Sequence, residues 1–591
     1  MKKLFLLGMM SAGCAFMAEA QIGDPIGKTA YDLQSNGSSG NRLVRHADGT
    51  ISATWIEICD VDPLFTYRGA GYNYFDGSSW IHGADGTCDE TGFANHGVAS
   101  EYVGWPEIAS FASGKEFIVS HTPLKFMSRP QKGTGGMAAW SATAALPVTG
   151  TTEANTWPRM VVDRSDNVGH LIASNSTDVN GVVGGIAYFR STDEGATWTE
   201  VALPGMDGSS FNDIGGDNYA IHANGGTVAI TAGSFESDWV MWKSTNAGAS
   251  FTKTIIRKFD PTDTVITTAG DIAYSSNDGF HAILVDNSAR VHAWSGAFDV
   301  AIDEDASMPN GWTTVGIYPQ TEGLFYWNDG MATDDYIALV EEREHIPGNG
   351  HWVGNGSNGV VDPLINSYQG SYTGMPNAAL ATNGDIYLVY SGILEGTSNS
   401  GDSTGQSFRD LYVMRGTNGG ANWEGPLNLG LALDGARGEY EEAVFPSVAH
   451  EMGADNLLHI LWQQDDEPGL HVRIDLDPQT VNTIMYRAVD VTTLDFTLST
   501  KDDVAAYVNA IEAYPNPTNG VAKINLDLKA NSNIMVQVTN LLGQVVATIP
   551  ARDYFTGPNE IRVDLSAQSS GVYLYSIIAN DFTVTKRLVK Q

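Results

Sequence analysis

The chain has 591 residues, of which 42% are hydrophobic, so it is long and apolar enough to form more than one globular domain. Its formal net charge of −37 gives a surface that repels phosphate backbones, which argues against nucleic acid as a partner.

The N-terminus has the pattern of a secretory signal peptide. Lys2 and Lys3 precede an apolar run over residues 4–10, and Ala18-Glu19-Ala20 has the A-x-A form of a cleavage site. We therefore expect residues 1–20 to be removed on export. No later apolar run approaches the roughly 18 residues that would span a bilayer, so no transmembrane segment is expected.

The chain has three cysteines, one in the expected signal peptide and two in the exported part. Cys14 lies within the signal peptide, where Ser11-Ala12-Gly13-Cys14 offers an alternative lipoprotein signal that lacks a branched apolar first residue. Cys59 and Cys88 remain in the exported chain, and an even pair in an oxidising compartment favours a disulfide. Two buried thiols are the alternative, and no zinc-ligand spacing is present.

Acidic clusters are the only candidates for a cation site. Asp60-Val61-Asp62 and Asp465-Asp466-Glu467 lack EF-hand spacing, so solvated negative charge is the simpler interpretation. Structural calcium is the alternative, and no metal ligand or other cofactor is assigned.

From about residue 42 to residue 490, short apolar runs alternate with Gly, Asn and Asp without helical periodicity, which predicts an all-β fold of short antiparallel strands. Repeated units each read as a strand, a polar turn and a second strand. Their starts recur every 52 to 62 residues between Trp105 and Ile272. This period is typical of a β-propeller, and we expect about seven blades, with six or eight as alternatives. The units begin at Asn41, Trp105, Trp157, Tyr219, Ile272, Met375 and Phe445.

A short motif recurs late in three of these units. Its acidic or amide side chain can bond the turn backbone, its glycine accepts a positive φ, and its final aromatic ring can be buried between blades. The segment "STDEGATW" from Ser191 resembles the Asp-box, or bacterial neuraminidase repeat, of sialidase-like β-propellers, which implies a scaffold role between the third and fourth strands. The motif residues are Ser191, Asp193, Gly195, Thr197, Trp198, Ser244, Asn246, Gly248, Phe251, Asn418, Gly420 and Trp423.

The resemblance places any ligand site on the opposite face, where one blade connects to the next. A sialidase also needs three arginines around the substrate carboxylate, a Tyr nucleophile activated by Glu, and an Asp acid/base. The family's Arg-Ile-Pro motif is absent, and Ser128-Arg129-Pro130 is a poor substitute. Candidate residues of this face are Glu101, Tyr102, Trp105, Trp157, Arg159, Asp217, Tyr219, Tyr372, Arg437, Glu439, Tyr440, Glu441 and Glu442.

Two functions follow from this face. The first is a propeller that binds glycans or other extracellular ligands without catalysis. The second is a sialidase-type exo-glycoside hydrolase. The missing motif favours the first function.

The last 80 or so residues form a separate unit. They are close to neutral: removing their charge of +1 and the +1 of residues 1–20 from the total leaves −39 on residues 21–509. Alternating apolar positions predict a small β-sandwich over residues 510–591. Within it, Tyr514-Pro515-Asn516-Pro517, Gly520, "NLLGQVV", "GVYLYSI" and "KRLVKQ" resemble the type A C-terminal sorting domain of the type IX secretion system in Bacteroidota. The resemblance implies the secretion machinery as a partner and a secreted or outer-surface location.

Overall fold

The computed structural model describes residues 23–591 with gaps. The chain divides into two compact units. The first ends at Leu494, and the second consists of Asp495–Gln591 together with Glu424–Leu427. The longer stretches outside the description are 1–22, 83–102, 135–139, 143–154, 305–311, 344–367, 399–406, 431–440 and 497–507.

The described residues of the first unit form seven antiparallel sheets, which confirms the all-β prediction. Four sheets from its N-terminal half follow chain order. They comprise β2 (Leu43–Arg45), β3 (Ile51–Glu57) and β4 (Gly69–Phe75); β5 (Gly104–Ser110), β6 (Glu116–His121), β7 (Lys125–Arg129) and β8 (Ser141–Ala142); β9 (Asn155–Asp163), β10 (Val168–Asn175), β11 (Ile186–Ser191) and β12 (Thr199–Val201); and β13 (Tyr219–Asn224), β14 (Thr227–Ala232), β15 (Trp239–Ser244) and β16 (Thr252–Arg257).

Three further sheets complete this unit, and one of them has six strands because its central hairpin is unusually long. Two short 3-10 helices, η3 (His471–Arg473) and η4 (Val491–Thr493), flank its last strand. The sheets comprise β17 (Thr264–Ile266), β18 (Ile272–Val285), β19 (Val291–Glu304), β20 (Trp312–Tyr318), β21 (Glu322–Asn328) and β22 (Ile337–Arg343); β23 (Thr373–Leu380), β24 (Ile386–Ser398), β25 (Ser407–Thr417) and β26 (Asn422–Asn428); and β27 (Glu442–Val448), β28 (Leu457–Asp465), β29 (Asn482–Asp490) and β1 (Asp24–Thr29).

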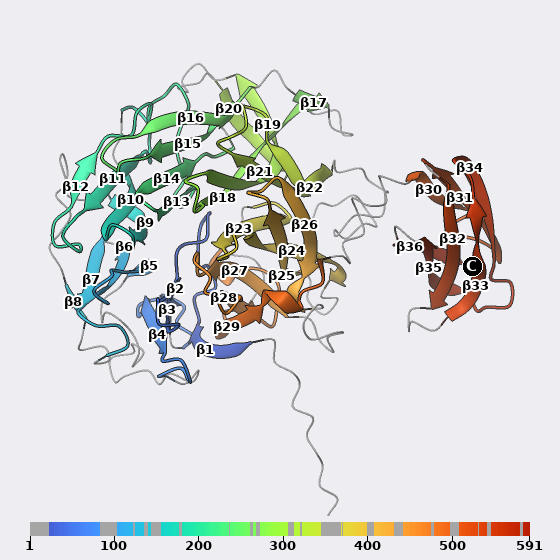
Figure 1. The fold of residues 1–591 in the computed structure, drawn as a ribbon, viewed down its shortest axis with the longest axis horizontal. Coiled ribbons are helices and arrows are strands. Elements are labelled where there is room, and N and C mark those ends of the chain that lie inside the picture. The colour runs from blue at the N-terminus through green and yellow to red at the C-terminus, as the bar shows by residue number, and fades with distance from the viewer. Residues whose placement is uncertain are drawn as a thin grey trace, which may run out of the picture. The chain divides into compact units, whose positions relative to one another are not determined.

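The seven sheets follow one another around a ring (Figure 1). Their inner strands contact in sequence: β2 with β5, β5 with β9, β9 with β13, β13 with β18, β18 with β23 and β23 with β27. The ring is completed by β2 against β28, and β1 pairs antiparallel with β29 in the last sheet. The two ends of the first unit are therefore held by backbone hydrogen bonds.

The predicted turn at Ser191 joins β11 to β12 and is built by side-chain hydrogen bonds. Ser191 Oγ donates to Asp193 Oδ1 at 2.8 Å and accepts from the Gly195 N–H at 2.8 Å. Asp193 also accepts from the backbone N–H and the hydroxyl of Thr197, at 2.9 and 2.6 Å. These contacts replace backbone partners that a tight turn cannot supply.

The turn also packs its sheet against the preceding one. Trp198 is 3% exposed, and its ring lies 6.4 Å from that of Phe117 and 5.8 Å from that of Phe126 between ring centroids. Gly195 has a φ of +76°, and a Cβ there would lie 2.6 Å from the Phe117 ring. Only glycine suits both the backbone angle and the close approach.

The other two copies of the motif dock in the same way. In the turn between β15 and β16, Asn246 Oδ1 accepts from Ser244 Oγ at 2.8 Å, and the Phe251 ring lies 4.7 Å from Tyr188 of the preceding sheet. In the turn between β25 and β26, the Trp423 ring lies 4.9 Å from Tyr326.

A fourth turn of this kind follows β4, and sequence reasoning missed it. Asp76 Oδ1 accepts from Ser78 and Ser79 N–H at 2.8 and 2.9 Å, and the Trp80 ring lies 4.8 Å from Tyr486 of the neighbouring sheet. Its acidic residue and aromatic residue are one position closer together than in the Ser191 copy, which hides the match.

The second unit has two antiparallel sheets with a shared core. The core is formed by alternating inward residues, such as Ile524, Val536, Ile561 and Ile577, all at most 1% exposed. The first sheet comprises β30 (Val508–Tyr514), β31 (Val521–Leu528) and β34 (Gly557–Asp564), and the second β32 (Ser532–Asn540), β33 (Val545–Tyr554), β35 (Gly571–Ala579) and β36 (Thr583–Lys590).

Two predictions lie outside the described residues: the signal peptide over 1–20 and the disulfide between Cys59 and Cys88. Over the residues that are described, no helix is both long and apolar enough to cross a membrane. The same residues contain no cluster of three or more metal-ligating side chains.

Candidate functional site

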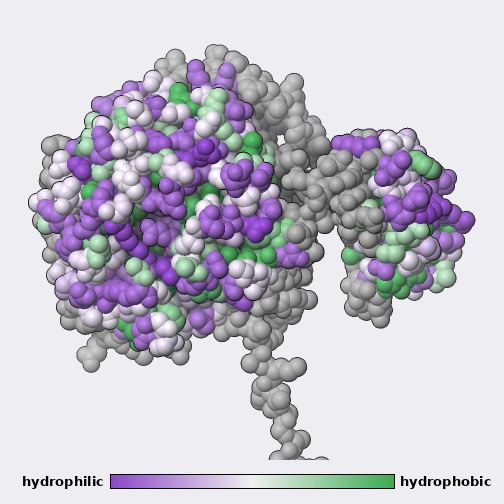
Figure 2. Space-filling view, viewed as in Figure 1, coloured by the Kyte–Doolittle hydropathy of each residue, from purple (hydrophilic) through white to green (hydrophobic). Residues whose placement is uncertain are grey.

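The ring has two chemically different ends. At the turn end, inner strands lead into short turns such as residues 163–168, and the motif turns lie at the same end because antiparallel strands alternate direction. At the connection end, the chain passes from one sheet to the next. A space-filling view shows a mainly hydrophilic hollow near the middle of the ring (Figure 2).

At the connection end, several inner strands carry a bulge at a large residue followed by proline. Trp105, Trp157, Met375 and Phe445 have φ values of +51°, +45°, +58° and +55°, and the pairing register shifts at each. Such values are rare for bulky residues. All four side chains belong to one apolar cluster, so the left-handed backbone at these residues places them in the core.

The partner of that cluster is the chain's own N-terminal segment, residues 30–41, which links β1 to β2. Its Tyr31 ring lies 5.1 Å from Phe65 and 6.0 Å from Trp105. The Arg68 guanidinium donates to the Tyr31 hydroxyl at 3.2 Å. Part of the predicted ligand face is therefore covered by residues of the same chain.

Arg159 holds the deeper part of the N-terminal segment. Its guanidinium pairs with Asp217 at 2.9 Å and with Glu107 at 3.3 Å, and it donates to the Ser38 carbonyl at 2.7 Å. All three charged side chains are at most 2% exposed. Buried charges persist only when they are paired and hydrogen-bonded, so this cluster has the composition of a structural network.

Asp217 and Glu107 also bind the backbone of the segment. Asp217 Oδ2 accepts from the Asn36 N–H at 3.0 Å, and Glu107 Oε2 accepts from the Asn41 N–H at 2.7 Å. A side chain at Gly40 would overlap Glu107, so the segment needs glycine there.

Other predicted residues of this face are buried as well. Tyr219 is 0% exposed and donates its hydroxyl to the Trp157 carbonyl at 2.6 Å, while Tyr372 is 6% exposed. Five predicted residues lie outside the described part of the chain, namely Glu101, Tyr102, Arg437, Glu439 and Tyr440.

A tyrosine–glutamate pair that the sequence did not reveal lies beside these residues. The Tyr368 hydroxyl donates to the Gly469 carbonyl at 2.9 Å and lies 2.7 Å from Glu442 Oε1, from which it accepts when the carboxyl is protonated. Burial raises the pKa of Glu442 to about 8, and burial followed by the Glu442 charge raises the pKa of Tyr368 well above its ordinary value. The Arg409 guanidinium lies 5.0 Å above the Tyr368 ring.

The two acidic clusters that were the alternative calcium sites do not have the features of a cation site. Asp62 accepts backbone N–H groups of its own loop, from Leu64 at 3.1 Å. Asp465 is 4% exposed, and burial raises its pKa to about 7. A carboxyl that is only about half ionised near pH 7 is a weaker calcium ligand than an ordinary Asp.

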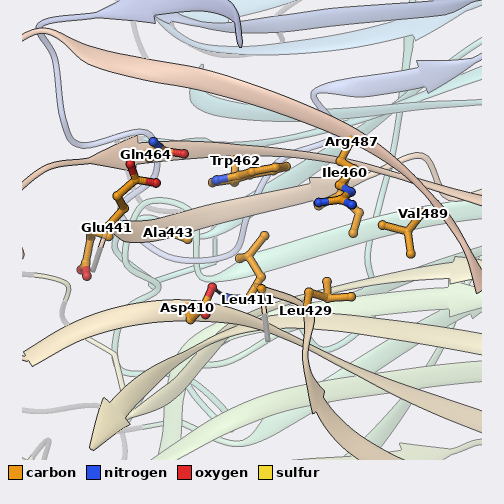
Figure 3. A pocket seen from close by; sticks show the side chains of 12 residues that line it. Asp410, Leu411, Leu429, Glu441, Ala443, Ile460, Trp462, Gln464, Arg487 and Val489 are labelled. Atoms are coloured by element: carbon orange, nitrogen blue, oxygen red, sulfur yellow. Dashed lines mark hydrogen bonds between the residues drawn. The ribbon is translucent and has the colours of Figure 1, made fainter. Parts of the chain in front are cut away.

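A pocket of about 380 Å³ opens beside β25, β27, β28 and β29. Its floor is apolar, with Leu411, Leu429 and Ile460, and Trp462 lies across its middle (Figure 3). Polar groups lie at both ends: Glu441 and Gln464 at one, Arg487 at the other, with Asp410 below Glu441 (Figure 3). Predicted residues Glu441 and Glu442 thus line an actual cavity.

Residues 512–591 match the family model described as a secretion system C-terminal sorting domain. This confirms the predicted sorting domain and the predicted location: the chain is a secreted or outer-surface protein exported by the type IX secretion system. A comparison with curated proteins gave no match.

Solved structures with similar folds share little sequence with the chain. PorZ, a surface component of the type IX secretion system of Porphyromonas gingivalis, is 13% identical with a TM-score of 0.33, and the match covers 95% of this chain and 60% of PorZ. A PL25 ulvan lyase is 10% identical with a TM-score of 0.39, over 78% and 96% of the two chains. The polysaccharide lyase Uly1 is 8% identical with a TM-score of 0.39, over 80% and 98%. At these TM-scores, none identifies the family of the first unit.

Proposed function

We propose that the first unit is a sialidase-like β-propeller of seven blades that binds an extracellular glycan, and that the second unit delivers it to the outer surface or the medium. The hydrogen-bonded motif turns and the sequence of contacts between inner strands support the propeller.

The pocket around Trp462 is the observation that carries glycan binding. Sugar rings present apolar faces that stack on indole rings and hydroxyl groups that bond to carboxylates and amides. Glu441, Gln464 and Arg487 supply the polar contacts of the pocket, and its apolar lining is Leu411, Leu429 and Ile460, supported by Trp462, which is 4% exposed.

Binding without catalysis is supported by how the arginines of the connection end are used. Arg159 is bound to Asp217 and the segment backbone, and Arg68 to Tyr31. Arg473 donates to Asn36 at 2.9 Å. These guanidinium groups contact the protein's own chain, where a sialidase needs them on a substrate carboxylate.

A glycan array with the mature full chain tests the proposal. We expect a defined set of binding glycans, with affinity lowered about tenfold in Arg487→Ala and Gln464→Ala, since each removes a polar contact. Arg290→Ala, on the exposed turn between β18 and β19, is the matched control and should bind normally. An array without signal, or equal binding by all variants, would contradict the site.

The Tyr368–Glu442 pair keeps a sialidase-type hydrolase as the second candidate, because such enzymes pair a Tyr nucleophile with Glu. The test is hydrolysis of fluorogenic sialosides by the wild-type chain and by Tyr368→Phe. Turnover by the wild type that is lost in Tyr368→Phe would establish catalysis. Absence of turnover leaves the binding function.

Delivery is tested by truncation in a producing Bacteroidota strain. A chain ending at residue 509 should retain its fold but accumulate in the periplasm, because it lacks the sorting domain. Normal levels of the truncated chain in the medium or on the outer surface would contradict the delivery role.

A further inference from the structure

The turn end of the ring axis contains a second cavity that the glycan proposal does not use. It is an open pocket lined by the last residues of the inner strands and by the residues that follow them. Two arginines, Arg45 and Arg164, and two histidines, His222 and His450, line it together with Glu451. In a first unit of strongly negative charge, such a gathering of basic side chains is unusual.

The two histidines present opposite hydrogen-bonding groups. Nδ1 of His222 accepts the Val285 N–H at 3.1 Å, so its Nε2 carries the proton and is a donor. Nδ1 of His450 lies 2.9 Å from the Ala378 carbonyl, which only accepts, so its Nε2 has the free lone pair. Burial lowers the pKa of both rings, which keeps them neutral at pH 7.

Neither Nε2 atom has a hydrogen-bond partner among the residues described here. His222 is 3% exposed, and the two rings lie 5.0 Å apart at an angle of 82°. Both atoms can therefore hydrogen-bond to water or to a ligand in the pocket.

The arginines are only partly used. Nη1 of Arg164 pairs with Glu451 at 3.4 Å, and Nη2 of Arg45 pairs with Asp455 at 3.0 Å. A guanidinium has five N–H donors, so both retain donors for a ligand. Glu451 is 52% and Asp455 41% exposed at the side chain, so solvent screens their repulsion of an anion.

We infer that this axial pocket binds a protonated oxyanion of the hydrogen phosphate type. Arg164, Arg45 and the His222 Nε2–H donate to its oxygens, and its own O–H donates to His450 Nε2. The acceptor, His450 Nε2, makes the site selective for a protonated anion. Sulfate carries no proton at neutral pH, so one of its oxygens would face the lone pair of His450 Nε2 without a hydrogen between them.

Calorimetry with the mature full chain tests this at constant ionic strength set with chloride. Inorganic phosphate should bind at one site, and sulfate at least about tenfold more weakly. Glucose 6-phosphate, compared with inorganic phosphate at pH 6, where both still carry a proton in substantial part, is a second arm: binding there too identifies a phosphate monoester that extends outward, and binding of inorganic phosphate alone identifies the free ion. Equal binding of sulfate, or no binding of either phosphate, overturns the inference.

The variants are chosen to keep the fold. His222→Asn retains an acceptor for the Val285 N–H, and His450→Asn retains a donor for the Ala378 carbonyl, yet both lose Nε2. Arg164→Gln changes a partly exposed side chain. Each should weaken phosphate binding about tenfold, with Arg290→Gln unchanged. Phosphate binding that survives in all three folded variants would also overturn the inference.

Discussion

Three buried carboxyl groups at the connection end of the ring and two carboxyl groups in turns at the other end have pKa values that are shifted in opposite directions. At the connection end, burial raises the pKa of Glu442 to about 8, of Asp465 to about 7 and of Asp278 to about 6. At the turn end, burial opposes the shift, but hydrogen bonds outweigh it and hold the pKa of Asp193 and of Asp286 below their ordinary values. These three buried carboxyls are therefore held closer to the neutral form than the turn carboxyls Asp193 and Asp286.

The two ends also differ in whether their polar side chains are already bound within the protein or are exposed beside a pocket. The connection end contains the N-terminal segment and its buried network, where Arg159 and Asp217 are already satisfied. The turn end leaves Arg164, at 27% side-chain exposure, beside the axial pocket. A ligand of the ring axis thus has better access from the turn end, and at the connection end it must bind off the axis, as in the pocket of Trp462.

The largest expected effect is a loss of stability as the pH rises. A carboxyl whose pKa is higher in the folded state stabilises the protein fully below its unfolded value, and this contribution disappears as the pH rises through the folded value. For Glu442 the window runs from about 4.5 to about 8. At about 1.4 kcal/mol per unit of pKa, the loss is on the order of 5 kcal/mol. Urea melts at pH 5, 7 and 9 measure it.

Glu442→Gln separates this carboxyl from the others. The amide imitates the protonated acid, since it can donate to the Tyr368 hydroxyl and accept the Arg409 N–H. The variant should be as stable as the wild type at pH 5 and more stable at pH 9. An unchanged pH profile would show that Glu442 is ionised in the folded protein.

Arg159→Met tests the network of the connection end. Removing the guanidinium leaves Asp217 and Glu107 without their partner in a buried site, which should lower the free energy of unfolding by about 4 kcal/mol. The matched change at the turn end, Arg164→Met, breaks an exposed pair and should cost less than about 1 kcal/mol. If chemical denaturation gave the same loss in free energy of unfolding for Arg159→Met and Arg164→Met, the two ends of the ring would not differ in this way.

The turn end was the more predictable of the two from sequence. Its motif places every hydrogen-bonding partner within a few residues: Ser191, Asp193 and Thr197 bond one another. Such local chemistry repeats with the unit and can be recognised. The fourth turn, at Asp76 and Trp80, escaped because a change of one residue in spacing breaks the pattern but leaves the packing intact.

The connection end could not be predicted in the same way. Residues 30–41 are rich in Ser, Gly and Asn and read as a linker, yet the Ser35 hydroxyl donates to Asp217, 182 residues away. Trp105 and Trp157 suggested ligand contacts because exposed-looking loops precede them, whereas a left-handed backbone turns them into the apolar cluster. The contacts of residues 30–41 leave no local signal, and the recurring large residue followed by proline marks the bulge without showing where the ring points. The second unit was predictable because family motifs span it.

Trp198→Ala tests how the turn end contributes to the fold. The ring fills the space between neighbouring sheets against Phe117 and Phe126, so its loss should lower the free energy of unfolding by about 3 kcal/mol. Thr199→Ala, at the exposed neighbouring position, should change it by less than about 0.5 kcal/mol. Phosphate affinity of the folded variant should stay unchanged. A stable variant that no longer binds would make the turn a ligand site and not a scaffold.

The smallest expected effect distinguishes charge from geometry in the same turn. Asp193→Ala removes the acceptor for Ser191 and Thr197 and should cost about 1 kcal/mol at pH 7. Asp193→Asn should leave the stability nearly unchanged at pH 7, because Asn246 makes the equivalent contacts in the next sheet, accepting from Ser244 Oγ at 2.8 Å and the Ser250 N–H at 3.0 Å.

The loss of stability in acid should separate Asp193 from asparagine further. The lowered pKa of Asp193 means that its contribution is present above the unfolded value and is lost as the pH falls through the folded one. Asparagine does not titrate, so Asp193→Asn should lose less stability than the wild type between pH 5 and pH 2. Parallel acid curves for the two proteins would show that the turn depends on the shape of the side chain and not on its charge.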